Sequence, residues 1–455
     1  MNRYDSGVVA SLLVAAGHVQ VKDPAQAEVY LINSCSVREH AEERLFKRLA
    51  ELAAWKRSRP ERRIGLLGCT AQGMGERALE KASHLDLIAG PKSYGRLLSN
   101  IERMGDREAV VDIGNAESEI QISKPQIQNL SAFVAVSRGC DNRCSYCIVP
   151  TVRGPERSRP AHAVLNEVCS LIASGTREVV LLGQNVNSYR DPGAVPAYSF
   201  ADLLRQVDEI PGIVRVGFLT SHPKDLSEDI LKVMAGSRHI AHHLHLPLQS
   251  GSDRILAAMN RQYSYASYLA RVGKAREIMP NLKLTTDLIT GFPGESEEDF
   301  EATLAAIREI QFDETFTFYY SEREGTPAAF LPGPVPLEVR KERLARMIAL
   351  TSHIASEAVA RQVGKEAWVF VEGPSRKDRN ACKGRTRENR EVVLESDGHK
   401  PGDVVKTAIQ GSSGRILLGT SQEDSSDIGF NSCPAGALAG HSEIQNSESQ
   451  IANEV

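Results

Sequence analysis

The stretch Ser137–Pro150, which reads SRGCDNRCSYCIVP, decides how the rest of the chain is organised. It holds Cys140, Cys144 and Cys147 in the spacing C-x3-C-x2-C, so three thiols share one short loop. Thiolates are soft ligands that favour zinc, copper(I) or an iron–sulfur cluster. Structural zinc takes four protein ligands, and no fourth Cys or His lies near this loop. Three thiolates on a four-iron cubane leave one iron open, so the loop predicts a reactive cluster; a zinc knuckle or three unrelated thiols are the alternatives.

The same loop resembles the signature of the radical S-adenosylmethionine (SAM) superfamily, C-x3-C-x-aromatic-C, with Tyr146 as the aromatic residue. The resemblance implies that the open iron chelates the amino and carboxylate groups of SAM. It also implies that one electron cleaves SAM into methionine and a 5′-deoxyadenosyl radical, which takes hydrogen from an unactivated C–H bond. In such enzymes the cofactors supply the reactive chemistry, and the protein positions them and excludes water.

The composition is that of a globular chain of 455 residues, 41% hydrophobic and 25% charged, which is long enough for several domains. No apolar run approaches the roughly 18 residues of a membrane span, and no secretory segment is present, so we expect a cytoplasmic protein without a membrane partner. Eight cysteines in such a chain favour metal binding or catalysis over disulfides. Without the six acidic residues of 421–455, 54 basic residues stand against 52 acidic ones, which is compatible with a nucleic-acid partner.

Strands that alternate with helices predict a parallel α/β domain over residues 1–113. In such sheets functional groups gather beyond the carboxyl ends of the strands, and Cys35 and Cys69 both follow an expected strand. Two inert, buried thiols are the alternative. The expected elements are a helix at Asp5–Ala16, a strand at Val29–Asn33, a helix from Val37, a strand at Ile64–Gly68 and a helix at Gly73–Lys81.

Residues 114–130 form a polar stretch that predicts a linker, and residues 131–360 then repeat strand–helix units. Six such units predict a partial (βα)6 barrel instead of the full eight. Turns with Gly and polar residues follow four of the strands and are expected to meet at one rim with the cysteine loop. These turns are Gly183–Gln184–Asn185, Ser221–His222–Pro223, Gln249–Ser250–Gly251 and Gly291–Glu295. The expected strands after Ala132–Ser137 are Glu178–Leu182, Val214–Phe218, His242–Leu246, Leu282–Ile289 and Glu314–Phe318.

Two histidines, His243 and His245, alternate with leucines in the run Ile240–Leu246 and therefore share one face of a strand. A metal site is possible at this spacing. We favour a structural or substrate-contacting role for both side chains.

A helix is expected at Leu337–Arg361, after which the hydrophobic period changes to two. Five short, glycine-punctuated strands over residues 361–420 predict a small β-barrel. Basic residues gather in it and are candidates for contacts with an RNA backbone, with a solvated face as the alternative. The candidates are Arg376, Lys377, Arg385, Arg387 and Arg390. Residues 421–455 are polar and are predicted to be disordered.

Taken together, the motifs resemble the methylthiotransferase family, which has an N-terminal methylthiotransferase domain, a radical SAM core and a C-terminal TRAM β-barrel. The stretches that carry the resemblance are NSCSVREHAEERLFKRL, LLGCTAQ, SRGCDNRCSYCIVPTVRGPERSRP, LHLPLQSGSDRILAAMNRQY and TDLITGFPGES. Two more, VLLGQNVNSY and GRTRENR, resemble a branch called MiaB. That branch converts isopentenyl-adenosine beside the tRNA anticodon to its 2-methylthio form.

The resemblance implies SAM and two 4Fe-4S clusters as cofactors. Cys140, Cys144 and Cys147 would hold the SAM-cleaving cluster, while Cys35 and Cys69 match two of three ligands of an auxiliary cluster that donates sulfur. The radical would take hydrogen from carbon 2 of adenine, where sulfur inserts before a second SAM methylates it. The SAM and base pocket would be lined by Tyr146, Gly183, Gln184, Asn185, Ser221, Gln249 and Gly291. The implied partners are tRNA and an electron donor such as flavodoxin or ferredoxin, and we expect a monomer.

One departure from the family concerns the N-terminal domain, which in the family opens with a strand that ends in GCQMN. The present sequence begins at Met1–Asn2, so the strand and the third cysteine of the auxiliary site are not in it. We favour a start assigned at an internal Met over a natural loss. We expect the auxiliary cluster to be loosely held, and the chain to cleave SAM but to transfer sulfur poorly.

Three other functions stay open. A sister enzyme would act on threonylcarbamoyl-adenosine or on a ribosomal-protein aspartate. A non-catalytic RNA-binding protein would carry structural metal, and zinc in place of iron with sulfide would identify it. A SAM-cleaving enzyme of unrelated substrate is the third, and the basic small barrel argues against it.

Overall fold

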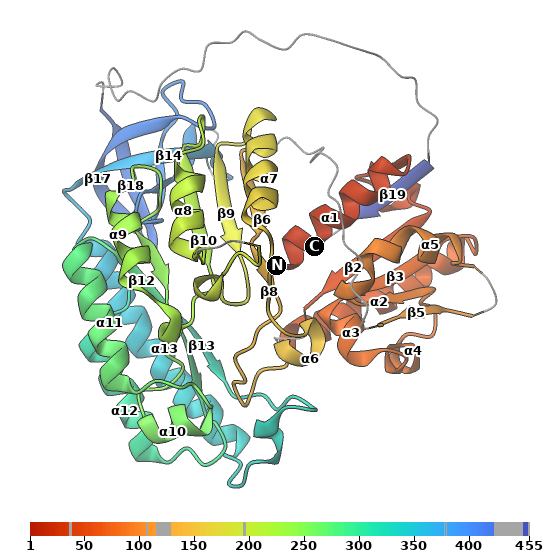
Figure 1. Cartoon of the computed structure of the whole chain (residues 1–455), viewed down its shortest axis with the longest axis horizontal. Coiled ribbons are helices and arrows are strands. Elements are labelled where there is room, and N and C mark those ends of the chain that lie inside the picture. The colour runs from red at the N-terminus through yellow and green to blue at the C-terminus, as the bar shows by residue number, and fades with distance from the viewer. Residues whose placement is uncertain are drawn as a thin grey trace.

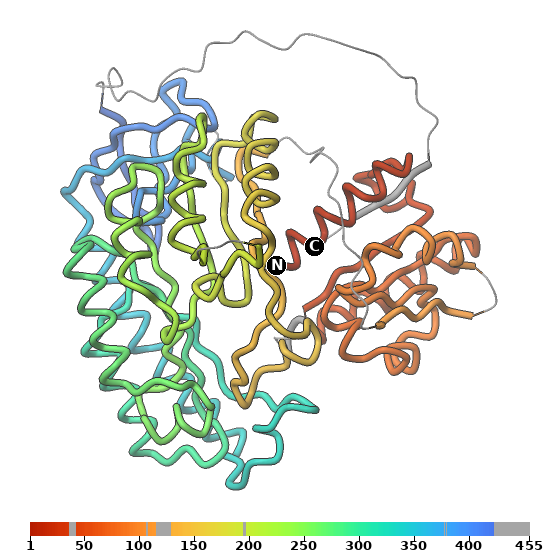
Figure 2. Tube along the Cα trace, in the orientation of Figure 1, coloured from red at the N-terminus to blue at the C-terminus, as the bar shows by residue number. Residues whose placement is uncertain are grey.

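The computed structural model describes the chain in three domains (Figure 1), which the trace in Figure 2 follows from the red N-terminal helix to the blue C-terminal barrel. It describes all residues except 36–38, 106–107, 115–128, 194–196, 377, 379, 423–448 and 454–455. Most of the predicted linker thus lies outside the described residues. None of the helices in the described part of the chain is long and apolar enough to cross a membrane.

The N-terminal domain is built on a six-stranded parallel sheet in the order β1-β19-β2-β3-β4-β5. Its central strands are apolar runs buried on both faces, as parallel sheets covered by helices require. The strands are β1 (His18–Val21), β2 (Val29–Ser34), β3 (Arg63–Gly68), β4 (Leu87–Ala89) and β5 (Val110–Asp112). The helices are α1 (Asn2–Ala15), α2 (Glu39–Ser58), α3 (Cys69–Met74), α4 (Arg77–Lys81) and α5 (Leu97–Glu102).

Two features of this domain differ from the sequence-based expectation. The helix expected at Gly73–Lys81 is split into α3 and α4, because Gly75 adopts a φ of +53° and ends α3. The tail, predicted to lack structure, contributes β19 (Ser449–Asn453). This strand pairs in parallel with both β1 and β2 and fills the position between them.

The central domain is a partial barrel of six parallel strands, as predicted, in two three-stranded sheets. The sheets run β6-β9-β10 and β11-β12-β13, and a bridge between Val216 and Ile240 joins them. The strands are β6 (Ser131–Ala135), β9 (Glu178–Leu182), β10 (Arg215–Leu219), β11 (His243–His245), β12 (Lys283–Thr290) and β13 (Glu314–Tyr319). The main helices are α7 (Ala161–Ala173), α8 (Phe200–Asp208), α9 (Glu228–Gly236), α11 (Tyr265–Ile278), α12 (Glu297–Ile310) and α13 (Leu337–Ala360).

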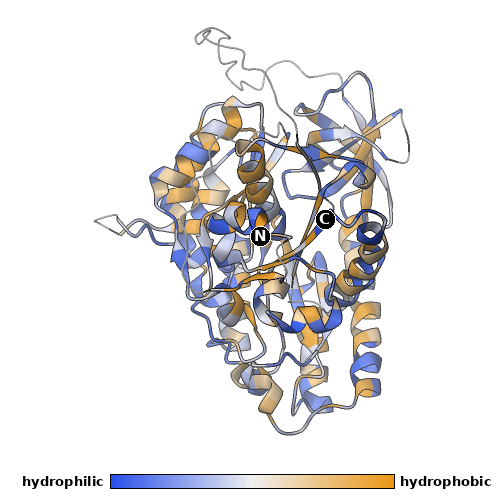
Figure 3. Cartoon of the chain, turned by 90° about the vertical axis from the view of Figure 1, so that its right-hand side faces the viewer, coloured by the Kyte–Doolittle hydropathy of each residue, from blue (hydrophilic) through white to orange (hydrophobic). Residues whose placement is uncertain are grey.

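These helices cover one face of the strands, and the shared core lies between the two layers. Leu244, Leu284 and Leu288 from the strands pack there with Val164, Leu203 and other helix residues. Figure 3 shows hydrophobic and hydrophilic residues alternating along the helices, as expected for helices with one buried face. The opposite, concave face of the strands does not take part in this core.

The C-terminal domain is a closed five-stranded β-barrel, as predicted, in the order β14-β15-β16-β18-β17. Val369, Val371, Val392 and Leu394 alternate toward its interior. The strands are β14 (Glu366–Pro374), β15 (Ala381–Thr386), β16 (Glu391–Glu395), β17 (Val404–Ser413) and β18 (Ile416–Ser421).

The turn between β15 and β16 joins this barrel to the amino-terminal ends of the central strands. Arg215, at the start of β10, donates hydrogen bonds to the carbonyl of Thr386 at 2.8 Å and to Asn389 Oδ1 at 2.9 Å. Arg390 pairs with Asp313, which precedes β13, and both side chains are only 10% exposed. The floor of the partial barrel is therefore closed by the C-terminal domain.

The other junction lies at α1, whose first turn sits beside β6 (Figure 1). Tyr4 and Val8 pack against Ala135 and Leu182 of the central strands. Asp5 forms a buried ion pair with Arg153 at 2.7 Å. The first helix therefore binds the N-terminal domain to the concave side of the barrel.

The buried pair at the floor gives a stability prediction. Replacing Arg390 by Met leaves the Asp313 carboxylate buried without its cation, so we expect the free energy of unfolding to fall by about 3 kcal/mol. Arg205→Met is the control, since its pair with Asp202 is exposed and should contribute less than about 1 kcal/mol. The measurement is the urea midpoint followed by Trp368 fluorescence in a Trp55→Phe background. Equal midpoints for both variants would contradict the assignment.

Candidate functional site

The cysteine loop is held by its own return strand. β7 (Ser137–Arg138) leads into the loop and pairs antiparallel with β8 (Arg157–Ser158). Gly139 adopts a φ of +75°, and a Cβ there would lie 2.0 Å from the carbonyl oxygen of Pro155. Only glycine fits this approach, which explains the Gly before the first cysteine.

The three thiols lie on the loop between β7 and α6 (Val149–Arg153). Cys144 is buried, Cys140 and Cys147 are half-buried, and the amide of Cys147 donates to the carbonyl of Cys144 at 3.0 Å. Burial raises the pKa of the Cys140 thiol and raises the pKa of Cys147 to about 12. A bound metal would displace these protons, because the thiolate is the ligand form.

The thiols share a loop without forming a closed ligand set. Among the residues that the structure describes, no three His, Cys, Asp or Glu side chains gather closely enough to hold a metal ion as they stand. Whether an iron–sulfur cluster fits this loop therefore depends on the three thiol ligands and on the side chains around them. Three thiols without a nearby fourth ligand suit an iron–sulfur cluster better than structural zinc.

The side chain that supports this fit is Arg261, which is only 4% exposed. It donates to Cys144 Sγ at 3.2 Å, to the carbonyl of Pro247 at 3.1 Å and to Tyr263 Oη at 3.0 Å. Within the described part of the chain, no carboxylate contacts this guanidinium. A buried cation is costly unless an anion faces it. A thiolate-bound cluster at the loop would supply that anion.

The rim turns present buried oxygens that a polar ligand could satisfy. Gln184 Oε1, Ser221 Oγ and Gln249 Oε1 are buried and have no hydrogen-bond partner in the structure. Each unpaired buried group costs about 1–3 kcal/mol, which native proteins rarely leave uncompensated. All three residues were predicted for the SAM pocket. Their hydrogen-bonding capacity suits the amino and hydroxyl groups of SAM.

Backbone strain marks the same rim. Thr220 and Gln249 both adopt a φ of 72°, although neither is glycine. A β-branched residue in this conformation is an outlier, and such strain concentrates at functional sites. No signal in the sequence indicated it.

Other predicted pocket residues have structural partners. Asn185 accepts from the His222 amide at 3.0 Å and donates to Asp225 at 2.7 Å, so it joins the turns after β9 and β10. A Cβ at Gly183 would lie 2.6 Å from Ser137 Oγ, and one at Gly291 would lie 2.4 Å from the Arg340 side chain. These contacts explain the two glycines by close packing.

Tyr146 and a nearby hollow complete the loop's surroundings. Tyr146 packs against the cluster of Ile255, Phe292 and Tyr320, and its hydroxyl lies 3.5 Å from the Arg261 guanidinium. A hollow of about 650 Å³ opens beside the loop. Its lining includes Asp141, Asn142, Glu156, Asn185, Ser188 and Lys224.

Cys35 and Cys69 lie at the ends of adjacent strands, as predicted, and Cys69 begins α3. Cys69 is buried, and its sulfur accepts from Arg153 Nε at 3.1 Å. Arg153 ends α6, the helix that directly follows the cysteine loop. Burial raises the pKa of Cys69. The Cys69 thiol of the N-terminal domain therefore contacts α6, the helix that directly follows the three-cysteine loop.

Sequence reasoning missed Arg153 and Arg261, although both lie in the quoted motifs PTVRG and MNRQY. A single arginine in a sequence is typical of a solvated surface, so its type gave no signal. Both were recognisable only from the thiol that each contacts.

The candidate RNA-binding residues of the small barrel fall into three groups. Arg376 is exposed, and Lys377 lies outside the described residues. Arg385 pairs with Glu372, and Arg387 donates to the carbonyl of Ser237. Arg390 is held at the floor by Asp313.

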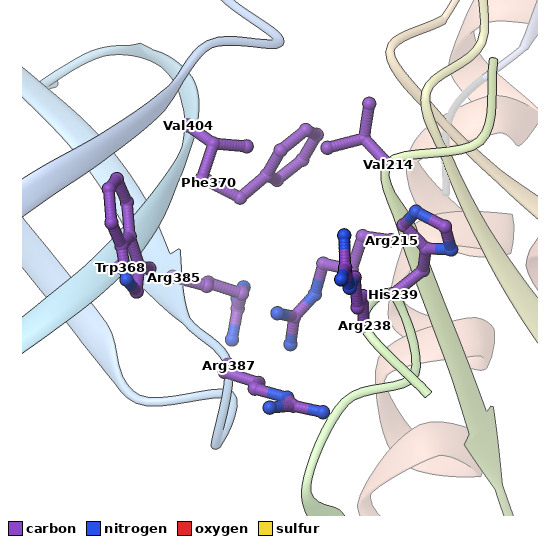
Figure 4. Close-up of a pocket in the computed structure, with 9 residues that line it drawn as sticks. All are labelled: Val214, Arg215, Arg238, His239, Trp368, Phe370, Arg385, Arg387 and Val404. Atoms are coloured by element: carbon purple, nitrogen blue, oxygen red, sulfur yellow. The ribbon is translucent and has the colours of Figure 1, made fainter. Parts of the chain in front are cut away.

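A hollow of about 200 Å³ lies where the small barrel meets the central domain. Figure 4 shows the guanidinium groups of Arg215, Arg238, Arg385 and Arg387 converging on it, with Trp368 and Phe370 beside them. Arg238 and Trp368 are exposed. The combination of cations and an accessible indole is typical of nucleic-acid contacts.

Comparisons with known proteins decide the family. Residues 134–307 match the model of the Radical SAM superfamily, and residues 1–90 match Uncharacterized protein family UPF0004. The tRNA-2-methylthio-N(6)-dimethylallyladenosine synthase of Desulfitobacterium hafniense (strain Y51) is 40% identical over 93% of this chain and 96% of that relative. The protein of the same name from Carboxydothermus hydrogenoformans is 43% identical over 90% of this chain and 94% of its own. The chain belongs to this synthase family.

Membership confirms the predicted methylthiotransferase family and makes the chain a radical SAM enzyme, which sets the non-catalytic alternative aside. One solved structure has a similar fold. The radical SAM methyltransferase TsrM from Kitasatospora setae matches with a TM-score of 0.51 and 15% identity, over 66% of each chain. That methyltransferase was solved with a [4Fe-4S] cluster and cobalamin bound.

The contact between Arg261 and Cys144 gives a prediction for cluster binding. Arg261→Met removes the buried cation, so we expect the affinity of the loop for the cluster to fall by about 10-fold or more. Arg261→Lys keeps the charge and should recover part of that affinity. The measurement is iron and sulfide retained per chain after anaerobic reconstitution, with Arg308→Met, an exposed arginine on α12, as control. Retention in Arg261→Met equal to the control would refute the role.

Proposed function

We propose that this enzyme inserts a methylthio group at carbon 2 of N6-dimethylallyladenosine beside the anticodon of tRNA. Relatives about 40% identical over most of the chain carry this activity in their names. The observation that carries the proposal is the buried Arg261, which no carboxylate of a described residue contacts, against Cys144 at the rim where Gln184, Ser221 and Gln249 leave their oxygens unpaired. An anionic cluster would compensate the charge of Arg261, and SAM would form hydrogen bonds with the three unpaired oxygens.

The chain's own residues have separate tasks in this proposal. Cys140, Cys144 and Cys147 hold the SAM-cleaving 4Fe-4S cluster, and Arg261 offsets its negative charge. Gln184, Ser221 and Gln249 bind SAM by hydrogen bonds. When bound, these cofactors supply the radical chemistry that an aromatic C–H bond requires, since no side chain has a pKa that could remove this proton. The apolar residues around Tyr146 keep water from the loop.

The sulfur is proposed to come from an auxiliary 4Fe-4S cluster at Cys35 and Cys69. The support is the contact between Cys69 and Arg153, which places this thiol beside the helix that follows the SAM-cluster loop. A flavodoxin or ferredoxin is the proposed electron donor, and the enzyme is proposed to act as a cytoplasmic monomer.

Nucleoside analysis tests the function. Deleting the gene should abolish 2-methylthio-N6-dimethylallyladenosine in tRNA and accumulate its N6-dimethylallyl precursor. Liquid chromatography with mass spectrometry measures both nucleosides. Complementation with the wild-type gene should restore the product, and Cys144→Ala should not. Loss of the 2-methylthio form of threonylcarbamoyl-adenosine, with the dimethylallyl nucleosides unchanged, would support the sister enzyme instead.

The hollow between the small barrel and the central domain is our proposed RNA contact. Arg215 and Arg385 are paired with Glu178 and Glu372, whereas Arg238 and Arg387 have no carboxylate partner among the described residues. Two cations that form no close ion pair, beside an exposed Trp368, match a backbone phosphate and a stacked base.

The double variant Arg238→Ala/Arg387→Ala tests this contact. We expect weaker tRNA binding and a slope of log K against log salt that falls by about 1 for each phosphate that the protein no longer binds. Fluorescence anisotropy with labelled tRNA measures both quantities, and Arg308→Ala on α12 is the matched control. A salt slope identical to that of the control would exclude the hollow as an RNA contact.

A further inference from the structure

The concave face of the partial barrel carries a layer of side chains that no step above uses. Leu244, Leu284 and Leu288 point into the core shared with the outer helices. Because side chains alternate along a strand, His243, His245, Thr285 and Asp287 point the other way. They therefore face the barrel interior.

The register of the strands arranges these side chains in levels. His243 stands beside Lys283, His245 beside Thr285, and Asp287 beside Phe316. One level further, Ile289 stands beside Phe318. Each level is two residues, or about 7 Å, above the one before.

The lowest level is closed by the C-terminal domain. His243 Nδ1 lies 3.3 Å from Asn389 Nδ2, and Lys283 donates to the Asn389 carbonyl at 3.3 Å and pairs with Glu314 at 3.2 Å. This polar network ties the floor to the C-terminal domain. The highest level lies beneath the cysteine loop, since Ile289 packs in the same cluster as Tyr146.

The two intermediate levels, that of His245 and Thr285 and that of Asp287 and Phe316, are preorganised and open. His245 is held by Thr285 Oγ1, 3.0 Å from its Nδ1, and by Asp287 Oδ2, 3.4 Å from its Nε2. Its ring meets Phe316 edge-on, with centroids 5.8 Å apart. Phe316 is nevertheless 40% exposed, and the Asp287 side chain is 32% exposed.

Such exposure is unusual for a phenyl ring inside a barrel whose other face is fully packed. Leu219, at the carboxyl end of β10 and on the same concave face by alternation, is 36% exposed. Apolar walls with a few fixed polar groups are typical of a binding site for an organic ligand. The site lies one level below the residues under the cysteine loop.

We propose that Asp287 and Phe316 form the pocket for the adenine base and its N6 substituent, an inference that rests on the proposed function. Asp287 accepts a hydrogen bond from the N6–H of the base. Phe316 and Leu219 contact the dimethylallyl chain. His245 is a positioning residue, because Thr285 and Asp287 fix its ring and it in turn supports Phe316. Anchoring the base through its N6 side leaves the carbon 2 edge free.

This arrangement predicts discrimination against unmodified adenosine. A base without the dimethylallyl chain leaves Phe316 and Leu219 exposed to water, so binding energy is lost in proportion to the apolar area. A pocket that senses a few methyl and methylene groups typically discriminates by 10-fold or more.

The experiment compares two anticodon stem–loop RNAs that differ only in carrying N6-dimethylallyladenosine or adenosine. The dissociation constants are measured by fluorescence anisotropy with the reconstituted enzyme in the presence of SAM. We expect the wild-type protein to prefer the modified RNA by about 10-fold. Phe316→Ala should remove most of this preference, and Phe316→Leu should retain much of it. Asp287→Asn should weaken binding of both RNAs, since both bases carry an N6–H.

Ile348→Ala, an exposed apolar residue on α13, is the control and should keep the full preference. The inference is overturned if the wild-type protein binds both RNAs equally, or if Phe316→Ala discriminates as well as the control. Product formation by the wild-type protein is measured separately by mass spectrometry. Discrimination without a methylthio product would refute the proposed function while leaving the pocket assignment supported.

Discussion

The buried guanidinium of Arg261 imposes the constraint on which the site depends. It is fixed by Pro247 and Tyr263 on one side and contacts the sulfur of Cys144 on the other. Because no carboxylate in the described part of the chain contacts it, the cation depends on the Cys144 thiolate, and on any cluster that this thiolate binds, for a compensating charge. The loop, the turn before α10 (Asp253–Ala258) and the strand ends are therefore coupled through one side chain.

The two flanking domains close the barrel at different places and leave its interior between them. The turn Thr386–Arg390 closes the amino-terminal ends of the strands, and α1 packs against β6 and β9 on the concave side. In the proposed pocket, a substrate base would enter from the rim, past the cysteine loop, and would descend no further than the level of Asp287 and Phe316. In this way packing between domains sets the depth of the proposed pocket.

Local patterns were sufficient for much of the fold, whereas long-range contacts were not. The strand Glu178–Leu182 and the cysteine loop followed from periodicity and spacing over a few residues. Charge alone suggested that Arg390 contacts RNA, but its partner Asp313 lies far away in sequence and appears only in the folded chain. Likewise Gly183 was predicted from the motif to line the SAM pocket, yet the side chain of Ser137 accounts for the missing Cβ. A tail of low hydrophobicity gave no indication that Ser449–Asn453 pairs with two strands of the first sheet.

The two arginine–thiol contacts differ in one respect that separates the two halves of the site. Arg153 contacts Cys69 as Arg261 contacts Cys144, but Asp5 already neutralises Arg153 at 2.7 Å. An anionic cluster at Cys69 would therefore compete with Asp5 for the same guanidinium, while one at Cys144 would meet an uncompensated cation. Electrostatics alone thus favours tight cluster binding at the three-cysteine loop and weaker binding at the N-terminal thiols. The ion pair of Asp5 and Arg153 also holds α1 of the N-terminal domain against the barrel.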